Sequence, residues 1–285
     1  MSTTEHNAML AFPQTKVNLG LNIVGRRPDG YHLLETVFYP VPVCDALELY
    51  TMADAFPSDV DCDLKVTGIN VEGDEQSNLV VRAYAMLKAD FPRLPRLHAH
   101  LHKAIPTQAG MGGGSSDATA MLTLLNTSFD LGLNDAQLAQ RAVRLGADCP
   151  FFVQGRPAYA QGIGEKLEPL DFSLAGWHLA VVRPNVSVST REAFAHVTPR
   201  RPDVCCRDVV CKEPVEHWRD ALVNDFEQSI FPQHPEIAEI KNKLYALGAA
   251  YSSMSGSGSA VYGLFREPVN LEKNFHGLFS RMVKL

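Results

Sequence analysis

The sequence lacks any apolar run long enough to span a bilayer, and it lacks the apolar core of a secretory signal and the arginine-rich pattern of a transit peptide. It also lacks a basic stripe, and its formal net charge is −6. Proteins that bind nucleic acid usually gather Lys and Arg on one face to neutralise phosphates. We therefore expect neither a membrane nor a nucleic acid as partner. Residues 1–7 are polar and without pattern, which predicts a disordered leader.

The six cysteines follow no spacing that is typical of a zinc site. Cys205 and Cys206 are adjacent, an arrangement poorly suited to tetrahedral ligation. This pattern favours reduced thiols and hence a cytoplasmic protein. His98, His100 and His102 alternate along a predicted strand and share one face, with no carboxylate or cysteine beside them. We interpret them as an exposed polar face rather than a metal site.

Length and apolar content indicate two domains. With 285 residues, 46% of them hydrophobic, the chain is long for one core and sufficient for two. We predict an α/β (α+β) fold with domains at residues 10–165 and 166–285. The predicted elements of the first domain are strands over residues 17–23, 36–41, 46–50 and 97–101 and helices over residues 78–88 and 135–145.

The second domain has fewer clear signals. Its predicted elements are a buried strand over residues 179–182, a short helix after Ser189 and an amphipathic helix over residues 235–247. Residues 199–214 mix cysteine, proline and charge, and they predict an irregular surface segment. Residues 255–259 alternate serine and glycine between two strand-like runs. They form either a tight hairpin or a further wall of a phosphate site, and the sequence favours the hairpin.

The most informative segment is the glycine-rich loop at residues 106–117. It follows the strand pattern at residues 97–101 and precedes helical spacing that starts near Ser116. Glycines let backbone N–H groups turn toward one point, and a helix N-terminus adds partial positive charge. No lysine follows Gly114, unlike in a Walker loop, and Ser115 stands where a dinucleotide fingerprint needs glycine. The loop predicts a distinct nucleotide-phosphate site, with a glycine turn that binds nothing as the alternative.

Two residues could carry phosphoryl-transfer chemistry next to such a loop. Lys16 projects from the polar face of the first strand, which it shares with Asn18, and its ammonium could neutralise developing charge. Asp148 lies between a helix end and a proline-initiated apolar segment, where its carboxylate is held on a constrained backbone. Each also has a structural alternative: a surface lysine, and an aspartate that caps a turn.

Together these residues resemble the GHMP kinases. The glycine loop indicates the superfamily, and the segment at residues 27–32, Arg-Pro-Asp-Gly-Tyr-His, indicates the members that act on a cytidine-diphosphate methylerythritol. The resemblance covers nearly the whole chain from residue 11. The matching segments are residues 16–19, 25–32, 106–117, 145–150, 188–190, 224–227 and 254–259.

The resemblance implies a two-domain GHMP kinase fold, with a ribosomal-S5-like N-terminal domain and a ferredoxin-like C-terminal domain. It implies transfer of the γ-phosphoryl group of ATP to the tertiary 2-hydroxyl of that substrate, in non-mevalonate isoprenoid synthesis. Asp148 is implied as general base, Lys16 as its electrostatic partner, and Ser116 as a weak ligand for the Mg²⁺ that accompanies ATP. The binding residues implied are Asn78, Pro106, Thr107, Gln108, Ala109, Gly110, Met111, Gly112, Gly113, Gly114, Ser115 and Ser116 for ATP, and Asn18, Tyr31, His32 and Thr190 for the substrate.

The sequence departs from the family at two positions, with Gln108 where glycine is usual and Thr15 where alanine is usual. If position 108 has a positive φ, a glutamine there crowds the nucleotide. Three alternatives stay open. They are another GHMP kinase, for example of homoserine or mevalonate; a nucleotide-binding protein without turnover; and an S5-like RNA-binding module, which the acidic charge disfavours.

Overall fold

The structure is a computed structural model that describes residues 8–53, 55–71 and 73–285. The predicted leader at residues 1–7 lies outside these residues. The described chain forms two compact units. Unit 1 comprises the described parts of Met1–Gln14, Cys44–Thr107 and Gly113–Gly155, and unit 2 comprises Thr15–Val43, Gln108–Gly112 and Arg156–Leu285.

These units differ from the predicted division at residue 165. The strands β2 (Gln14–Arg26) and β3 (His32–Cys44) come early in the sequence, yet nearly all of their residues belong to unit 2. The middle of the glycine loop, Gln108–Gly112, also belongs to unit 2, whereas its two ends belong to unit 1. Contacts between residues far apart in sequence decide the units, so a division by sequence position does not find them.

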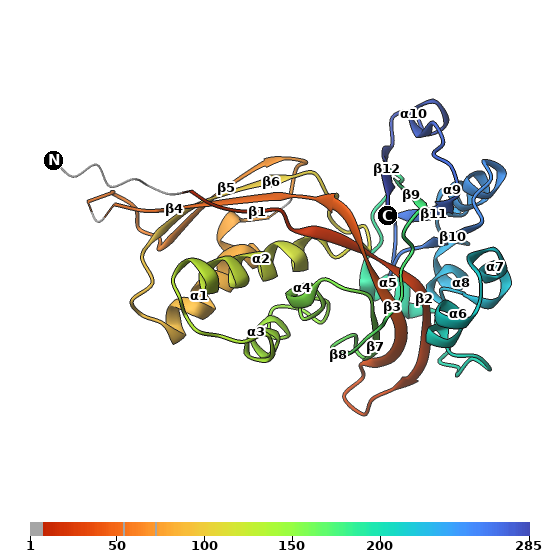
Figure 1. Cartoon of the computed structure of the whole chain (residues 1–285), viewed down its shortest axis with the longest axis horizontal. Coiled ribbons are helices and arrows are strands. Elements are labelled where there is room, and N and C mark those ends of the chain that lie inside the picture. The colour runs from red at the N-terminus through yellow and green to blue at the C-terminus, as the bar shows by residue number, and fades with distance from the viewer. Residues whose placement is uncertain (1–7, 54, 72) are drawn as a thin grey trace. The chain divides into compact units, whose positions relative to one another are not determined.

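Unit 1 is a four-stranded sheet with helices on one face. Its strands are β1 (Met9–Ala11), β4 (Ala46–Thr51), β5 (Cys62–Gly68) and β6 (Leu97–Lys103). Its helices are η1 (Glu75–Ser77), α1 (Leu79–Asp90), α2 (Gly113–Ser128), α3 (Asp135–Ala142) and α4 (Phe151–Gln154). The strand order is β1-β4-β6-β5, with β5 parallel to β6 and the other neighbours antiparallel. Figure 1 shows α1 and α2 side by side against this sheet.

Apolar and histidine side chains alternate along β6, and the apolar ones pack on the helices. Leu97, Ala99 and Leu101 are buried in the core of unit 1, and the three intervening histidines lie on the opposite face. The Oγ1 atom of Thr67 lies 2.8 Å from a ring nitrogen of His100 and is also hydrogen-bonded to the next histidine of the row. The histidine row is therefore a hydrogen-bonded polar surface of an ordinary strand.

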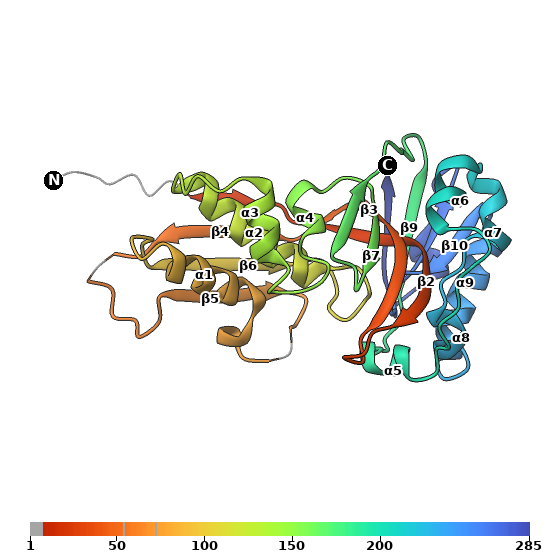
Figure 2. The ribbon, with the colours of Figure 1, turned by 90° about the horizontal axis from the view of Figure 1, so that it is seen from below.

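Unit 2 contains two four-stranded sheets. The first has the order β2-β3-β7-β8 and adds β7 (Ala158–Gly162) and β8 (Lys166–Pro169). The second has the antiparallel order β10-β11-β9-β12 and consists of β9 (His178–Arg183), β10 (Tyr251–Met254), β11 (Val261–Phe265) and β12 (Phe279–Lys284). The helices are α5 (Thr190–Ala195), α6 (Cys206–Lys212), η2 (Val215–His217), α7 (Trp218–Ala221), α8 (Phe226–Ile230), α9 (Pro235–Ala246) and α10 (Leu271–Asn274). In Figure 2, α9 lies beside β10, and it packs on β10 and β11.

Local signals located several helix starts. Asn78, Asn134 and Ser189 each cap a helix, and each side-chain oxygen accepts a backbone N–H of the first turn. These caps confirm the predicted helices that follow them. The helix after the glycine loop, however, begins at Gly113 rather than near Ser116, so that prediction is wrong by one turn.

Two other segments test the prediction for the second half. The irregular segment predicted at residues 199–214 is wrong in part, because Cys206–Lys212 forms α6. Its apolar face is only Val209, Val210 and Cys206, too short a pattern to read from sequence. The hairpin predicted at residues 255–259 is confirmed, since β10 pairs with β11 and Met254 lies opposite Val261.

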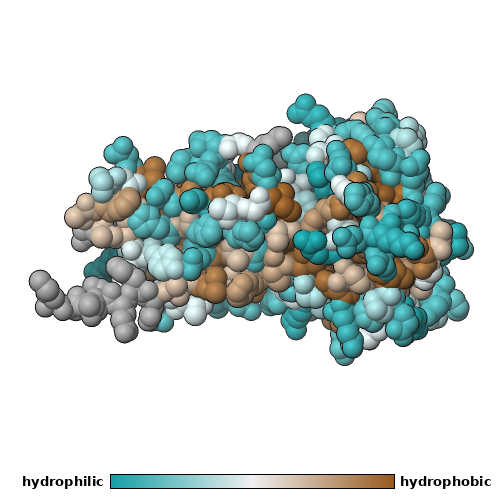
Figure 3. All heavy atoms as spheres, turned by 90° about the horizontal axis from the view of Figure 1, so that it is seen from above, coloured by the Kyte–Doolittle hydropathy of each residue, from teal (hydrophilic) through white to brown (hydrophobic). Residues whose placement is uncertain are grey.

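No helix of the described residues is long and apolar enough to cross a membrane. The face shown in Figure 3 carries mostly hydrophilic residues with hydrophobic ones among them. The large hydrophobic side chains that are exposed include Tyr31, at 61%. An exposed aromatic ring at a predicted substrate position is suited to stacking on a ligand.

Gly20 allows β2 to pack closely within unit 2. Its φ is +68°, and a Cβ atom built there would lie 2.5 Å from Cδ1 of Leu222 and 3.1 Å from Cβ of Cys206. A side chain at this position would therefore meet both backbone strain and an occupied core.

We predict that Gly20→Ala lowers the free energy of unfolding by about 2–3 kcal/mol, because the methyl group clashes and the left-handed conformation is strained. Urea unfolding measures this change. Gly25→Ala in the same strand is the matched control, since its Cβ would meet Leu33 at an ordinary 3.5 Å. We expect a loss below about 1 kcal/mol there. Equal losses in the two variants would contradict the packing argument.

Candidate active site

Lys16 and Asn18 lie on β2, and both are buried, at 3% and 2% exposure. The open polar face predicted for this strand is wrong, because neighbouring segments of unit 2 cover it. The Nζ atom of Lys16 donates to Oδ1 of Asn18 at 2.7 Å and to the carbonyl of Gly110 at 3.1 Å. It also lies 4.9 Å from the ring centroid of Phe38. Asn18 in turn donates to the hydroxyl of Thr36 at 3.0 Å, so the ammonium is held at the glycine loop by fixed partners.

The middle of the glycine loop is tied to β2 by backbone contacts. The N–H of Lys16 donates to the carbonyl of Met111 at 3.0 Å, and the hydroxyl of Thr15 donates to the same carbonyl at 2.9 Å. The hydroxyl of Thr15, beside Lys16, thus helps to hold the backbone of the glycine loop on β2.

The serine–glycine loop at residues 255–259 packs on the glycine loop. The hydroxyl of Ser255 donates to the carbonyl of Gly110 at 2.9 Å, and the N–H of Ala260 donates to the carbonyl of Ala109 at 3.2 Å. A Cβ on Gly110 would lie 1.9 Å from the carbonyl oxygen of Ser255. The hairpin loop therefore packs directly on the glycine loop, whereas its role as a wall of a phosphate site stays a prediction.

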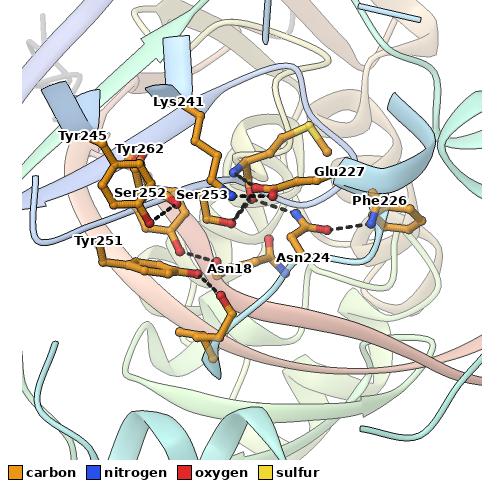
Figure 4. A network of polar contacts seen from close by, with 12 residues as sticks. Asn18, Asn224, Phe226, Glu227, Lys241, Tyr245, Tyr251, Ser252, Ser253 and Tyr262 are labelled. Atoms are coloured by element: carbon orange, nitrogen blue, oxygen red, sulfur yellow. Dashed lines mark hydrogen bonds and ion pairs between the residues drawn. The ribbon is translucent and has the colours of Figure 1, made fainter. Parts of the chain in front are cut away.

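A buried polar network holds that hairpin in place (Figure 4). Asn224 donates to the carbonyls of Met254 at 2.7 Å and Gly256 at 2.9 Å. The carboxylate of Glu227 accepts from the N–H of Met254 at 2.8 Å and from Lys241 at 2.5 Å. The segment at residues 224–227 is thus a support for the loop, which explains a motif whose role the sequence did not indicate.

Unit 1 contains a cavity of about 440 Å³ beside the start of α2. Three of the predicted ATP-binding residues line it, namely Asn78, Thr107 and Gly114. The side chain of Asn78 is also the N-cap of α1, with Oδ1 accepting from the N–H of Val80 at 2.9 Å. The cavity is open to a helix N-terminus and to glycine backbone, which are features of a nucleotide-binding site.

A buried cluster that sequence analysis missed lies beside this cavity. Lys103 forms an ion pair with Asp117 at 2.6 Å and another with Asp45, and all three side chains are at most 3% exposed. One carboxylate oxygen of Asp45 accepts the backbone N–H of Ile105 at 2.8 Å. Oδ1 of Asp117 has no hydrogen-bond partner among the described residues. The cluster fixes the chain that enters the glycine loop against the first turns of α2.

Asp148 lies in the turn that leads into α4 and is partly exposed. The hydroxyl of Thr119 on α2 donates to the carbonyl of Cys149 at 3.0 Å. A Cβ on Gly146 would lie 3.3 Å from the sulfur of Cys149 and 3.6 Å from the hydroxyl of Ser115. Within unit 1, the turn that carries Asp148 is therefore placed at the glycine-loop end of α2.

One of the predicted substrate residues, His32, belongs to an aromatic cluster in unit 2. His32 stacks on Phe194 with ring centroids 4.5 Å apart, and Phe194 packs edge-on against Phe226. Burial, and then the guanidinium of Arg26, lower the pKa of His32. A neutral imidazole offers one donor and one acceptor. Phe194 had no distinguishing sequence signal, although it follows the cap at Ser189 by about one helical turn.

The remaining predicted residues differ in accessibility. Thr190 is exposed at the start of α5, in the helix that carries Phe194. Ser116 is 2% exposed, whereas Ser115 is partly exposed. Mg²⁺ takes oxygen ligands and keeps several waters when it accompanies a nucleotide. No group of three or more His, Cys, Asp or Glu side chains in the described part of the chain could hold a metal ion. Ser115 is therefore the more accessible of the two adjacent serine oxygens.

Comparison with known proteins identifies the family of this chain. Residues 78–156 match the GHMP kinases N terminal domain, and residues 212–282 match the GHMP kinases C terminal domain. A Bacteroides fragilis protein named 4-diphosphocytidyl-2-C-methyl-D-erythritol kinase is 47% identical over 97% of this chain and all of its own length. The chain belongs to the GHMP kinases. A protein of the same name from Bacteroides thetaiotaomicron is 51% identical over 90% of this chain and 92% of its own.

A solved structure shares the GHMP kinase fold. It is titled as a crystal structure of 4-(cytidine 5'-diphospho)-2C-methyl-D-erythritol kinase, with a TM-score of 0.80 and 29% identity over 97% of this chain and 99% of its own. The two-domain GHMP kinase fold, with mixed helices and sheets, is therefore confirmed.

This GHMP kinase has an unusual residue in its glycine loop. Gln108 has a φ of +51°, in the left-handed region where glycine is favoured, and its side chain is exposed. The condition under which a glutamine at this position crowds the nucleotide, a positive φ, is therefore fulfilled.

We predict that Gln108→Gly lowers the KM for ATP about two- to fivefold, because it relieves strain of about 1 kcal/mol and clears the mouth of the loop. Steady-state kinetics with varied ATP measure this effect. Gln108→Ala removes the long side chain but keeps the strained Cβ, so it separates crowding from strain. Unchanged ATP affinity in Gln108→Gly would overturn the prediction.

The buried carboxyl of Asp117 makes the stability of the protein depend on pH. Burial raises the pKa of Asp117 to about 7; the Lys103 ammonium opposes this rise and the Asp45 carboxylate adds to it. An aspartate in the unfolded chain has a pKa of about 3.9. Between these values the folded chain binds a proton that the unfolded chain has lost, so the free energy of unfolding falls as pH rises from about 4 to about 7.

Over this pH range, we expect the free energy of unfolding of Asp117→Asn to fall by about 1–3 kcal/mol less than that of the wild type. The reason is that the amide stays neutral while it accepts from Lys103 and donates toward Asp45. Urea unfolding at several pH values measures it. Lys103→Met is the contrasting variant, since it leaves two buried carboxyls without their cation and costs about 3–5 kcal/mol. Parallel pH curves for the wild type and Asp117→Asn would refute the assignment.

Proposed function

We propose that this chain is an ATP-dependent kinase that transfers the γ-phosphoryl group to the 2-hydroxyl of 4-diphosphocytidyl-2-C-methyl-D-erythritol. The observation that carries the proposal is the combination of a buried lysine at the glycine loop with an aromatic cluster in the same unit. A small alcohol substrate needs no aromatic surface, whereas a cytosine base does. The two Bacteroides relatives reported above carry the name of this enzyme, and almost their whole length aligns with this chain.

In the proposed reaction, the residues of this chain mainly position groups and neutralise charge, since phosphoryl transfer has a loose transition state. The ammonium of Lys16, held by Asn18 and the Gly110 carbonyl, stabilises negative charge that develops near the loop. Asp148 accepts or orients the proton of the attacking hydroxyl. Mg²⁺ bound with ATP would neutralise phosphate charge, with Ser116 or Ser115 as its protein oxygen.

We assign ATP to the glycine loop and to the cavity of unit 1, and the cytidine group to unit 2. The proposed ATP contacts are the cavity residues Asn78, Thr107 and Gly114 together with the rest of the glycine loop. The proposed cytidine contacts are Tyr31 and His32. Phe194 is added to them because it already stacks on the imidazole. All six cysteines are free thiols, which supports a cytoplasmic location.

The test of the function is ADP release from ATP and Mg²⁺ with three acceptors, namely the cytidine compound, homoserine and mevalonate. We expect turnover only with the cytidine compound, and Asp148→Asn should lower kcat at least about 100-fold. Asp148→Asn removes charge and basicity together, so near-normal turnover would exclude the base role. Binding of ATP without turnover on any acceptor would instead indicate a nucleotide-binding protein that has lost its chemistry.

We predict that Tyr31→Ala and Phe194→Ala each raise the KM for the cytidine substrate about tenfold, because each removes stacking worth about 1–1.5 kcal/mol. The KM for ATP should stay within twofold. Phe56→Ala, at an exposed ring in unit 1, is the control and should change neither constant. Equal effects on both substrates would argue against a base site at this cluster.

A further inference from the structure

The strand β2, which carries Lys16, lies at the edge of its sheet, whose order is β2-β3-β7-β8. An edge strand presents a row of backbone N–H and C=O groups that no neighbouring strand pairs. Several backbone groups of β2 bond instead to other parts of unit 2. The N–H of Lys16 donates to the carbonyl of Met111 at 3.0 Å, and the N–H of Leu21 donates to the carbonyl of Val223 at 2.8 Å. Contacts from outside the sheet therefore help to place this strand.

A further contact to β2 comes from the side chain of Tyr262 on β11. Its hydroxyl donates to the backbone carbonyl of Asn18 at 2.7 Å, although the two residues are 244 positions apart in the sequence (Figure 4). Tyr262 is completely buried, at 0% exposure. Burial, and then the neighbouring Tyr251, raise the pKa of Tyr262 well above its ordinary value. The hydroxyl therefore keeps its proton and stays a donor to β2.

The alternation of side chains along β11 directs Tyr262 toward β2. Val261 and Phe265 belong to the core that α9 covers, and successive side chains of a strand point to opposite faces of the sheet. Tyr262 therefore projects from the other face. Its ring packs edge-on against Tyr251 with centroids 5.9 Å apart, and Tyr251 packs edge-on against Trp218 at 5.6 Å. These buried rings fix the position of the hydroxyl.

The residue that Tyr262 contacts also holds Lys16. The Nζ atom of Lys16 donates to Oδ1 of Asn18 at 2.7 Å, and Nδ2 of Asn18 donates to the hydroxyl of Thr36 at 3.0 Å. Asn18 is therefore fixed at its side chain by Thr36 and at its backbone by Tyr262. It is 2% exposed, so a group of Asn18 that loses its partner is left buried and unsatisfied.

We propose that Tyr262 is a positioning residue for phosphoryl transfer. Its hydroxyl sets the place of the Asn18 backbone, and Oδ1 of Asn18 then sets the place of the Lys16 ammonium. This role rests on the proposed kinase function, in which that ammonium meets the negative charge that develops near the glycine loop. Phosphoryl transfer depends mainly on positioning, so a small displacement of the ammonium slows the reaction. Tyr262 is buried and acts through Asn18, without touching the reacting groups.

The variant Tyr262→Phe tests this role, because it removes one oxygen atom and keeps the ring. We expect kcat with the cytidine substrate to fall about five- to tenfold in steady-state kinetics. The KM for ATP should stay within twofold, since the cavity assigned to ATP lies in unit 1 and does not include this ring. A fall in kcat below twofold would overturn the proposal.

Tyr84→Phe is the matched control. Its ring is also buried and its hydroxyl also donates to a backbone carbonyl, that of Pro95 at 2.9 Å, but it lies in unit 1 and does not contact β2. Both variants should shift the midpoint of urea unfolding downward, because each leaves a carbonyl without its partner. Only Tyr262→Phe should lower kcat. Equal losses of kcat in the two variants would show a merely structural role and contradict the proposal.

A double-mutant cycle locates the effect at Asn18. Thr36→Val removes the hydroxyl that holds the side chain of Asn18, and it should also lower kcat, whereas Thr36→Ser keeps the hydroxyl and should preserve kcat. Because Thr36→Val and Tyr262→Phe act on the same residue, their combined loss should be smaller than the product of the two single losses. A combined loss equal to that product would contradict a path through Asn18.

Hydrogen exchange of the full chain, followed by peptide mass spectrometry, measures the contact whether or not the chain is a kinase. We expect peptides that cover residues 15–20 to exchange about tenfold faster in Tyr262→Phe and at an unchanged rate in Tyr84→Phe. Unchanged exchange in Tyr262→Phe would overturn the proposal even for an active kinase. Faster exchange in a chain that turns over none of the three acceptors would count against the proposed function, and it would still support the placement of Asn18 and Lys16 by Tyr262.

Discussion

The carbonyl oxygen of Gly110 is the point on which the site in unit 2 depends. It accepts hydrogen bonds from Nζ of Lys16 and from the hydroxyl of Ser255, so β2, the glycine loop and the β10–β11 hairpin meet at one acceptor. No side chain fits at this position, because a Cβ would lie 1.9 Å from the carbonyl oxygen of Ser255. A buried ammonium is tolerated only where such partners satisfy it. The position of the lysine therefore follows from the backbone geometry of two loops.

Both units use buried polar groups to fix backbone rather than to add stability. In unit 2, Asn224 and Glu227 bind the backbone of the hairpin that covers Gly110. In unit 1, Lys103 holds Asp117 on α2, and Asp45 binds the backbone that enters the loop. Such clusters contribute little net free energy, but they penalise any arrangement that leaves a member unpaired. They preserve one loop conformation, which is what phosphoryl transfer requires of its scaffold.

The same β2 strand carries residues of the candidate site and a close packing contact. Lys16 and Asn18 face the glycine loop, and Gly20 lies against Cys206 on α6. His32 stacks on Phe194 in the same unit, at the proposed cytidine site. A strand that is buried on both faces transmits displacement better than an open one, because close-packed neighbours leave no space to absorb it.

The sequence alone predicted those features of this protein that depend on neighbouring residues in the chain. The glycine loop and the ordered motifs identified the family, and the caps at Asn134 and Ser189 located two helices, because a few neighbouring residues fix a turn or a helix start. Only the tertiary structure decided the burial of Lys16 and the pairing of Lys103 with Asp45, 58 residues away in sequence. It alone placed Phe194 on His32 and Cys206 against Gly20. These contacts join segments far apart in the chain, and a residue's local pattern carries no record of its distant neighbours.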